Sequence, residues 1–303
     1  MKSWRHLAVR AVAQLLPMTR AYVACVVLLA GAAACGGDAA PVPATTPAIE
    51  RSYPTIVEGD PGLATHTIYR PADLDAVAGT LPIVAWGNGG CLNAGRAFRV
   101  FLEPLAAHGF LILSSGPPVP AAGTTTPQLL LDAITWAVAE SARAGSKYAG
   151  KLDPGRVAVM GTSCGGLEAM AVSADPRVRS TVLWNSGIGV DGGVVVGEDA
   201  LDRLHAPTAW ITGGPSDFAS PYAADDYARV SDRVPSLLGR FGDVGHFGLL
   251  LGSAEALDEM VRFATLWLDF TLNGNAAAGR ELVGSPCGLC ADPRWVVESK
   301  GFD

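Results

Sequence analysis

The sequence contains few charged and few aromatic residues. Asp, Glu, Lys and Arg make up 17% of its 303 residues, and Phe, Trp and Tyr make up 7%. The sequence has 22 basic residues, which form no run or patch beyond the N-terminus, and its 29 acidic residues outnumber them. Nucleic-acid binding relies on clustered basic residues, so nucleic acid is not an expected partner. The sequence also lacks an apolar run of about 18 residues, which excludes an ordinary membrane-spanning helix.

The first 34 residues are typical of an export signal. Residues 1–20 contain four basic residues and no acidic one, and the apolar run AYVACVVLLAGAAA occupies residues 21–34. Its length suits the apolar region of a signal peptide. Small residues followed by Cys35 resemble a bacterial lipoprotein signal, which implies that Cys35 becomes the lipidated first residue of the mature protein. Ala32 stands where such signals usually carry Leu, so an ordinary cleaved signal is the alternative, and Met18 is an alternative start.

We therefore expect an exported protein that a lipid anchors on the periplasmic or cell-surface side of a membrane. If Cys35 is not modified, we expect a secreted protein. Removal of the signal takes away four basic residues and changes the net charge from −7 to −11, so attachment would depend on acyl chains rather than on attraction to anionic lipids. Residues 35–59 begin rich in Pro, Ala and Thr and are expected to form a flexible linker.

From about residue 60, short apolar runs alternate with helical patterns. The expected strands are residues 63–70, 81–87, 110–115, 156–161, 178–185, 207–213 and 236–243. The expected helices are residues 95–109, 126–145, a segment starting at 165, 221–232 and 254–272. This alternation predicts one α/β domain over residues 60–303, with a mostly parallel sheet, helices on both faces and a Cys-containing tail after the last helix.

The segment VAVMGTSCGG, residues 157–166, carries the clearest chemical signal. It places the pattern G-x-S-x-G directly after an expected buried strand and before an expected helix. In that context a nucleophilic serine sits on a tight strand-to-helix turn, and Gly161 and Gly165 leave room for it. Ser163 is therefore the predicted nucleophile. The alternatives are an incidental serine in a glycine-rich turn, and Cys164 as nucleophile, for which the β-branched Thr162 would be a poor neighbour.

From residue 60 to about 272 the chain resembles the α/β-hydrolase superfamily. The segments WGNGGC and GTSCGG resemble those of exported serine esterases in the branch that includes dienelactone hydrolases, cutinases and chlorophyllases. The resemblance implies the α/β-hydrolase fold and the chain order serine, acid, histidine. His246 in DVGHFG follows the last expected strand and is the predicted base, and Asp217 in GGPSDFA is the predicted acid. Asp225 and Asp226, in the helix that follows, are expected to be solvated. Asp243 is three residues from His246 and is expected to shape that loop.

The same resemblance implies an oxyanion hole formed by backbone N–H groups. One belongs to Cys164, and the other to the loop AWGNGGC, where Asn88 is the first choice and Gly89 the second. In that fold the two loops are neighbours, so we expect the disulfide Cys91–Cys164; unpaired buried thiols are the alternative. The second expected disulfide joins Cys287 and Cys290. Aromatic residues near strand ends are candidates for the substrate cleft: Trp86, Trp184 and Phe218.

The predicted activity is hydrolysis of a carboxylic ester through an acyl-enzyme, without a metal or an organic cofactor. Only about 20 residues separate the expected strands 178–185 and 207–213. We therefore expect no large lid domain, and an open cleft suits a short-chain, aromatic or polymeric ester. The alternatives are amide, thioester or transacylation chemistry on the same triad, and a non-catalytic lipoprotein that binds a ligand or a partner.

Overall fold

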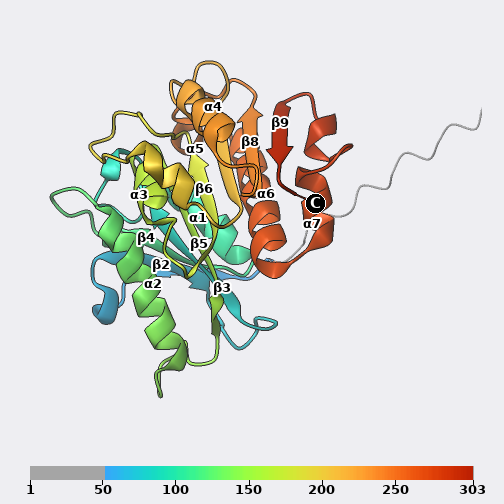
Figure 1. Cartoon of the computed structure of the whole chain (residues 1–303). Helices are drawn as coiled ribbons and strands as arrows, with labels where there is room; N and C mark the ends of the chain where they lie inside the picture. Colours follow the sequence, from blue (N-terminus) through green and yellow to red (C-terminus); the bar gives the residue numbers. More distant parts are fainter. Residues whose placement is uncertain (1–51, 303) are drawn as a thin grey trace, which may run out of the picture. The chain divides into compact units, whose positions relative to one another are not determined.

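Nine strands of residues 52–302, the part of the chain that the computed structural model describes, join into one sheet (Figure 1). Their spatial order is β1-β2-β4-β3-β5-β6-β7-β8-β9. In chain order the strands are β1 (Thr55–Glu58), β2 (His66–Pro71), β3 (Leu81–Gly87), β4 (Leu111–Ser115), β5 (Leu152–Thr162), β6 (Val178–Trp184), β7 (Thr208–Thr212), β8 (Ser236–Phe241) and β9 (Trp295–Lys300).

Helices connect most of the parallel strands. The α-helices are α1 (Arg99–Ala107), α2 (Pro127–Ala142), α3 (Cys164–Val172), α4 (Ser220–Arg229), α5 (Gly248–Leu251), α6 (Ala254–Asn273) and α7 (Ala276–Leu282). Short 3-10 helices are η1 (Pro61–Leu63), η2 (Gly89–Cys91), η3 (Glu198–Arg203) and η4 (Leu289–Ala291). Of these, only η3 lies between β6 and β7 in the described chain, in the segment where the sequence analysis expected no large lid domain.

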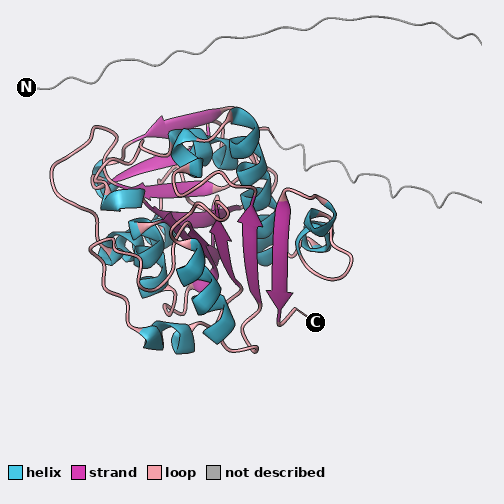
Figure 2. Ribbon diagram, turned by 90° about the horizontal axis from the view of Figure 1, so that it is seen from above, coloured by secondary structure: helices cyan, strands magenta, loops and turns pink. Residues whose placement is uncertain are grey.

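The central strands β4, β3, β5, β6, β7 and β8 run parallel, and antiparallel pairs complete both edges. The predicted α/β class with a mostly parallel sheet is therefore confirmed. Both faces of the central strands are covered, which explains why these strands read as continuous apolar runs instead of alternating. Figure 2 shows the twist of the sheet, because the strands at its two edges point in very different directions.

Two layers of helices form the core on the two faces. On one face α1 and α6 pack against Trp86, Met160 and Trp184 of the strands. On the other face α2 and α3 cover Ala85 and Val159, and α4 extends that layer over β7. Parallel strands all point their carboxyl ends to one edge, so the loops that follow β3, β5, β7 and β8 meet there.

The two edges of the sheet differ from the sequence prediction. β1 lies within residues 35–59, which were expected to be linker throughout, and α7 and β9 lie in the expected tail. β1 is only partly buried and β9 is mostly exposed, so neither strand carries the apolar run that marks the central strands. A strand at the edge of a sheet has a neighbour on one side only and can leave one face exposed. Its sequence therefore need not contain a continuous apolar run.

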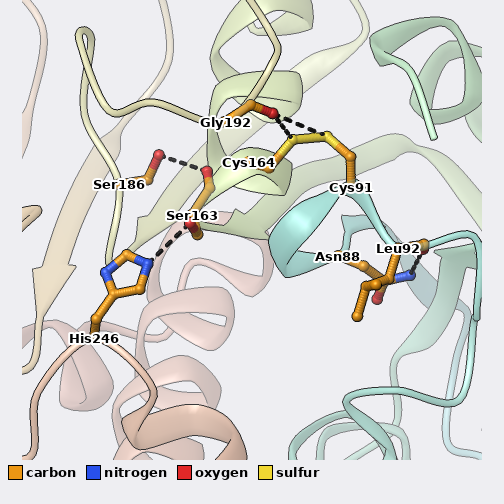
Figure 3. Close-up of a disulfide and its surroundings, with 8 residues drawn as sticks. All are labelled: Asn88, Cys91, Leu92, Ser163, Cys164, Ser186, Gly192 and His246. Atoms are coloured by element: carbon orange, nitrogen blue, oxygen red, sulfur yellow. Dashed lines mark hydrogen bonds between the residues drawn. A yellow bond between two sulfur atoms is a disulfide. The ribbon is translucent and has the colours of Figure 1, made fainter. Parts of the chain in front are cut away.

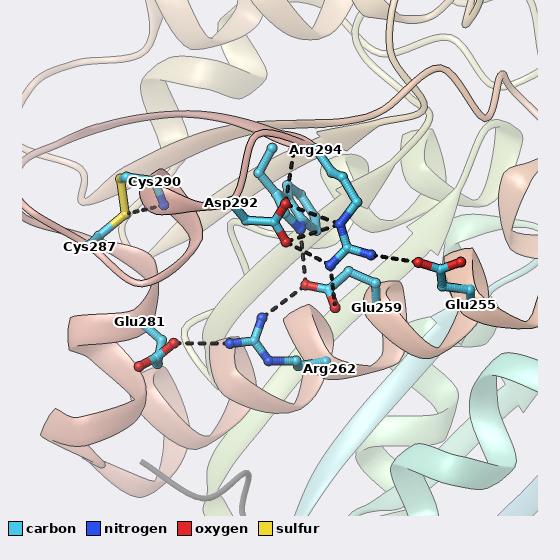
Figure 4. Close-up of polar contacts among 9 residues, drawn as sticks. Glu255, Glu259, Arg262, Glu281, Cys287, Cys290, Asp292 and Arg294 are labelled. Atoms are coloured by element: carbon cyan, nitrogen blue, oxygen red, sulfur yellow. Dashed lines mark hydrogen bonds and ion pairs between the residues drawn. A yellow bond between two sulfur atoms is a disulfide. The ribbon is translucent and has the colours of Figure 1, made fainter. Parts of the chain in front are cut away.

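Polar contacts hold the C-terminal segment against α6 (Figure 4). Arg294 pairs with Asp292 at 2.7 Å and with Glu255 of α6 at 3.0 Å, and the indole N–H of Trp295 donates to Glu259 at 3.1 Å. The disulfide between Cys287 and Cys290 joins the segment before η4 to a residue within it, which confirms the second predicted pair. The tail is thus part of the folded domain rather than an appendage.

The N-terminal predictions cannot be compared with the fold. The signal segment 1–34, Cys35 and most of the linker lie outside the described residues. Within residues 52–302, no helix combines the length and the apolar character needed to cross a bilayer.

Candidate active site

Ser163 sits on the tight turn between β5 and α3. Its φ of 53° and ψ of −120° are strained for a residue with a side chain. A Cβ added at Gly161 would collide with the carbonyl of Gly165, and one added at Gly165 would collide with the backbone of Gly87. The glycines of the G-x-S-x-G pattern are therefore required by close backbone approach, as the sequence analysis predicted.

Hydrogen bonds from β6 and the loop after it fix this turn. The N–H of Ser163 donates to the carbonyl of Trp184 at 2.9 Å, and the hydroxyl of Ser186 donates to the carbonyl of Ser163 at 2.8 Å. The strained backbone is thus held from the neighbouring strand, and the Ser163 side chain points toward His246 (Figure 3).

The structure brings the three predicted residues Ser163, His246 and Asp217 together. Nε2 of His246 lies 2.9 Å from Oγ of Ser163, and Nδ1 lies 2.8 Å from Oδ1 of Asp217. Asp217 follows β7 and His246 follows β8, so the parallel sheet delivers all three groups to the same edge. His246 is 8% exposed and Asp217 1% exposed. In this geometry Asp217 accepts a hydrogen bond from Nδ1–H of His246, which leaves Nε2 free to accept the hydroxyl proton of Ser163.

Four donors surround the Asp217 carboxylate. Oδ1 also accepts from the N–H of Ala219 at 2.9 Å, and Oδ2 accepts from the N–H of Gly213 at 3.0 Å and from Nδ2 of Asn185 at 2.7 Å. Burial by itself raises the pKa of Asp217, but the hydrogen bonds from His246, Asn185 and the two backbone groups outweigh it and lower this pKa below its usual value. Asp217 is therefore a fixed anion that orients the imidazole.

Asn185 is a site residue that the sequence analysis missed. It follows β6 directly, has a φ of 46° and is 1% exposed. A non-glycine residue in this left-handed region is uncommon, and asparagine tolerates it better than most. The only sequence signal was an amide side chain at the end of an apolar strand, which does not by itself indicate a contact with Asp217.

The remaining carboxylates behave differently from one another. Asp225 is exposed and pairs with Arg229, as expected, and Oδ1 of Asp243 accepts from the N–H of Ser216 at 2.7 Å, so it does shape the loop. The prediction that Asp226 is solvated is wrong. Asp226 is fully buried, where it accepts from the indole of Trp210 at 3.2 Å, and burial raises its pKa to about 6. Asp226 lies on the inner face of the amphipathic helix α4. Two adjacent aspartates in a sequence do not indicate which of them faces the core.

The disulfide Cys91–Cys164 is present, with its Cα atoms 5.3 Å apart (Figure 3). It joins η2, after β3, to the residue that follows Ser163. The carbonyl oxygen of Gly192 lies 2.7 Å from the sulfur of Cys164. This bond confirms the predicted pair and rules against Cys164 as nucleophile, because a disulfide sulfur is not a thiolate.

The three predicted oxyanion donors differ in how they are placed relative to Ser163. Cys164 is the first residue of α3, so its N–H has no acceptor within the helix. Gly89 lines the pocket at Ser163. The side chain of Asn88 is buried and turned away, because its Nδ2 donates to the carbonyl of Ser115 at 2.6 Å and its Oδ1 accepts from Trp86 at 3.0 Å. Asn88 therefore fastens the loop through its side chain, which is not available to an oxyanion.

A pocket of about 180 Å³ opens beside Ser163 and His246. Its walls are mainly apolar, and the side chains that supply them are Leu92, Phe98, Phe247, Leu249 and Leu250. Of the residues that line this pocket, none is Lys, Arg, Asp or Glu. Within residues 52–302, no three His, Cys, Asp or Glu side chains are grouped as ligands of a metal ion.

Two of the three predicted cleft aromatics are wrong. Trp86 and Trp184 are 0% and 1% exposed and belong to the core beneath α1 and α6. Phe218 is 53% exposed and stacks on the His246 ring, with centroids 3.7 Å apart. Alternate residues of a strand face opposite sides, and the side chains of Trp86 and Trp184 point into the covered face rather than toward the strand end. Other large apolar side chains near the pocket are also exposed: Leu92, Phe247, Leu250 and Leu251.

Comparison with known proteins adds no relative to this description. No protein-family model matches the chain, and no curated protein matches its sequence.

Proposed function

We propose that the protein is a serine hydrolase of the α/β-hydrolase type that cleaves carboxylic esters through an acyl-enzyme. The observation that carries the proposal is the continuous chain of contacts from Ser163 through His246 to Asp217 on a strained, glycine-flanked turn. A structural serine has no need of a strained backbone or of a histidine held by a buried anion. Nucleophilic catalysis needs both.

In the proposed reaction Oγ of Ser163 attacks the ester carbonyl while Nε2 of His246 takes its proton. The Asp217 carboxylate stabilises the imidazolium that forms, and the N–H groups of Cys164 and of Gly89 or Asn88 stabilise the oxyanion. Protonated His246 then gives its proton to the leaving alkoxide. Water repeats the cycle on the acyl-enzyme and releases a carboxylic acid, which regenerates Ser163.

The pocket favours an uncharged ester with a small apolar acyl group. Its volume of about 180 Å³ is close to that of engineered cavities that hold one benzene molecule. A benzoyl or butyryl group would fit it, whereas a long acyl chain would extend across the exposed rim of Leu92, Phe218 and Phe247. An open, apolar rim also suits a polymeric or aromatic leaving group.

A fluorophosphonate probe and a panel of p-nitrophenyl esters test this proposal. We expect the probe to label the wild type and Ser299→Ala, which changes an exposed serine of β9, but not Ser163→Ala. Among acetate, butyrate, benzoate and palmitate esters, kcat/KM is expected to be highest for butyrate or benzoate, by at least about tenfold over palmitate.

Failure of the wild type to react with the probe would exclude the hydrolase and favour a non-catalytic binding protein. Labelling combined with faster turnover of matched amides or thioesters would keep the nucleophile and replace the ester by the alternative substrate class.

We also propose that the protein is exported and anchored by a lipid at Cys35. The two disulfides support export, because such bonds persist mainly in oxidising compartments. In cells fed an alkynyl fatty acid, the wild type and Cys25→Ala are expected to take up the label and to fractionate with membranes. Cys35→Ser is expected to lose both properties. Equal labelling of Cys35→Ser would contradict the anchor and leave the secreted alternative.

A further inference from the structure

Helix α3 carries a buried carboxyl group that the proposed mechanism does not use. Glu168 lies five positions after Ser163 and is 0% exposed. Neither of its carboxyl oxygens has a hydrogen-bond partner among the described residues. A buried carboxylate without a partner is costly, and such groups occur where they serve a purpose or where they are neutral.

The carboxyl group packs against the loop that is proposed to form the oxyanion hole. A Cβ added at Gly87 would lie 2.8 Å from Oε2 of Glu168, so the carboxyl occupies the space that a side chain at position 87 would fill. Gly87 is followed directly by Asn88 and Gly89. The carbonyl oxygen of Gly165 would lie 2.6 Å from the same Cβ, so the loop at Gly87 is bounded by both the backbone of α3 and the Glu168 carboxyl.

The surroundings of Glu168 contain hydroxyl groups but no cation. The Thr125 hydroxyl lies near the carboxyl, and the N–H of Thr125 donates to the carbonyl of Cys91 at 2.9 Å, on the same loop. Ser115 is buried as well, and it follows the residue of β4 that pairs with Trp86, which places it beside Gly87. Neither hydroxyl has another hydrogen-bond partner in the described chain.

No cation on the elements that pack against α3 contributes to the pKa of Glu168. β3 contains no ionisable side chain, and the cysteine of η2 is in a disulfide. The ionisable residues of the other packed elements contribute nothing to the pKa of Glu168: Asp132 and Glu140 of α2, Asp153 and Arg156 of β5, and Arg179 of β6. Burial raises this pKa to about 7, and the nearby Thr125 hydroxyl only partly opposes the effect.

We propose that Glu168 is a positioning residue for the oxyanion loop and that it acts as an uncharged carboxylic acid. The inference rests on the proposed hydrolase function. When neutral, the group packs against Gly87 and adds no charge behind the loop. When ionised, it places a negative charge beside the N–H groups that must stabilise a developing oxyanion, and this opposes the reaction.

The sign of the pH effect follows from the raised pKa. The neutral form is favoured in the folded protein, so the stability it contributes is fully present below about pH 4.5, the usual value for Glu, and is lost as the pH rises through about 7. Activity is expected to fall over the same upper range.

The test compares Glu168→Gln, Glu168→Ala and Asp226→Asn with the wild type. Gln keeps the shape without the charge, Ala removes the packing, and Asp226→Asn removes another buried acid with a raised pKa that does not contact the loop. For the ester with the highest kcat/KM, the ratio of kcat in Glu168→Gln to kcat in the wild type is expected to grow about tenfold between pH 6 and pH 9. Glu168→Ala is expected to have a lower kcat at every pH with little change in KM.

Thermal unfolding as a function of pH provides a readout that does not depend on hydrolysis. Glu168→Gln is expected to flatten the decline of Tm between about pH 4.5 and 7, and Asp226→Asn the decline between about pH 3.8 and 6. Only Glu168→Gln should change the kcat ratio. A flatter Tm curve with an unchanged kcat ratio would overturn the positioning role. If the wild type neither reacts with the fluorophosphonate nor cleaves any ester, the hydrolase proposal fails and the inference falls with it, whatever the Tm curves show.

Discussion

Replacement of His246 by Ala is expected to lower kcat for ester hydrolysis by about 10⁶-fold, because residues of a serine-histidine pair act as a unit. Without the imidazole 2.9 Å from Oγ, Ser163 keeps its proton and is a poor nucleophile. For the same reason the double variant Ser163→Ala/His246→Ala should be no slower than either single variant.

Single-turnover and steady-state rates with p-nitrophenyl butyrate measure this effect. His108→Ala is a suitable control, since His108 contacts the carbonyl of Pro104 at the end of α1 and should keep kcat within about twofold of the wild type. A loss of less than about 10²-fold in His246→Ala would mean that another group serves as the base. Multiplicative losses in the double variant would mean that Ser163 and His246 do not act together.

Removal of the Cys91–Cys164 disulfide is expected to lower the free energy of unfolding by about 4 kcal/mol. The bond joins residues 73 positions apart, and in the chain-entropy model a loop of that length is expensive to close in the unfolded state. Because the same bond ties η2 to the start of α3, kcat should also fall, by at least about tenfold in Cys91→Ala/Cys164→Ala.

The second disulfide provides a matched control. Cys287 and Cys290 are only 3 positions apart, so the same model gives about 2 kcal/mol for Cys287→Ala/Cys290→Ala. Urea titrations under oxidising conditions measure both losses, and ester turnover should stay near the wild-type rate in this control. Equal activity losses in the two pairs would contradict a specific role of the Cys91–Cys164 bond at the candidate site.

The resemblance to the α/β-hydrolases implied the order of the site residues along the chain before the fold was known. Ser163, Asp217 and His246 each follow an apolar run, and in a parallel sheet the ends of such runs meet at one edge. The glycines around Ser163 were also readable, since the turn leaves no room for side chains there. Local patterns therefore indicated where the polar groups converge.

Residues that support the candidate site through contacts with distant segments could not be predicted from the sequence. Asn185 donates to Asp217, 32 positions further along the chain, and the proposed role of Glu168 depends on its packing against Gly87, 81 positions earlier. Trp86 and Trp184 were misplaced for a related reason, because a position near a strand end does not say which face its side chain takes when both faces are buried.

The amino-acid sequence by itself determined the α/β class, the central strands and the turn that carries Ser163, and its resemblance to the α/β-hydrolases indicated Asp217 and His246. Apolar periodicity and glycine placement are local properties, so they can be recognised in the sequence without knowledge of the fold. Only the tertiary structure decided the edge strands β1 and β9, the four donors around Asp217, the buried state of Glu168 and Asp226, and the size of the pocket. These depend on which surfaces are pressed together, and burial and hydrogen bonding between distant segments have no signature in a single stretch of sequence.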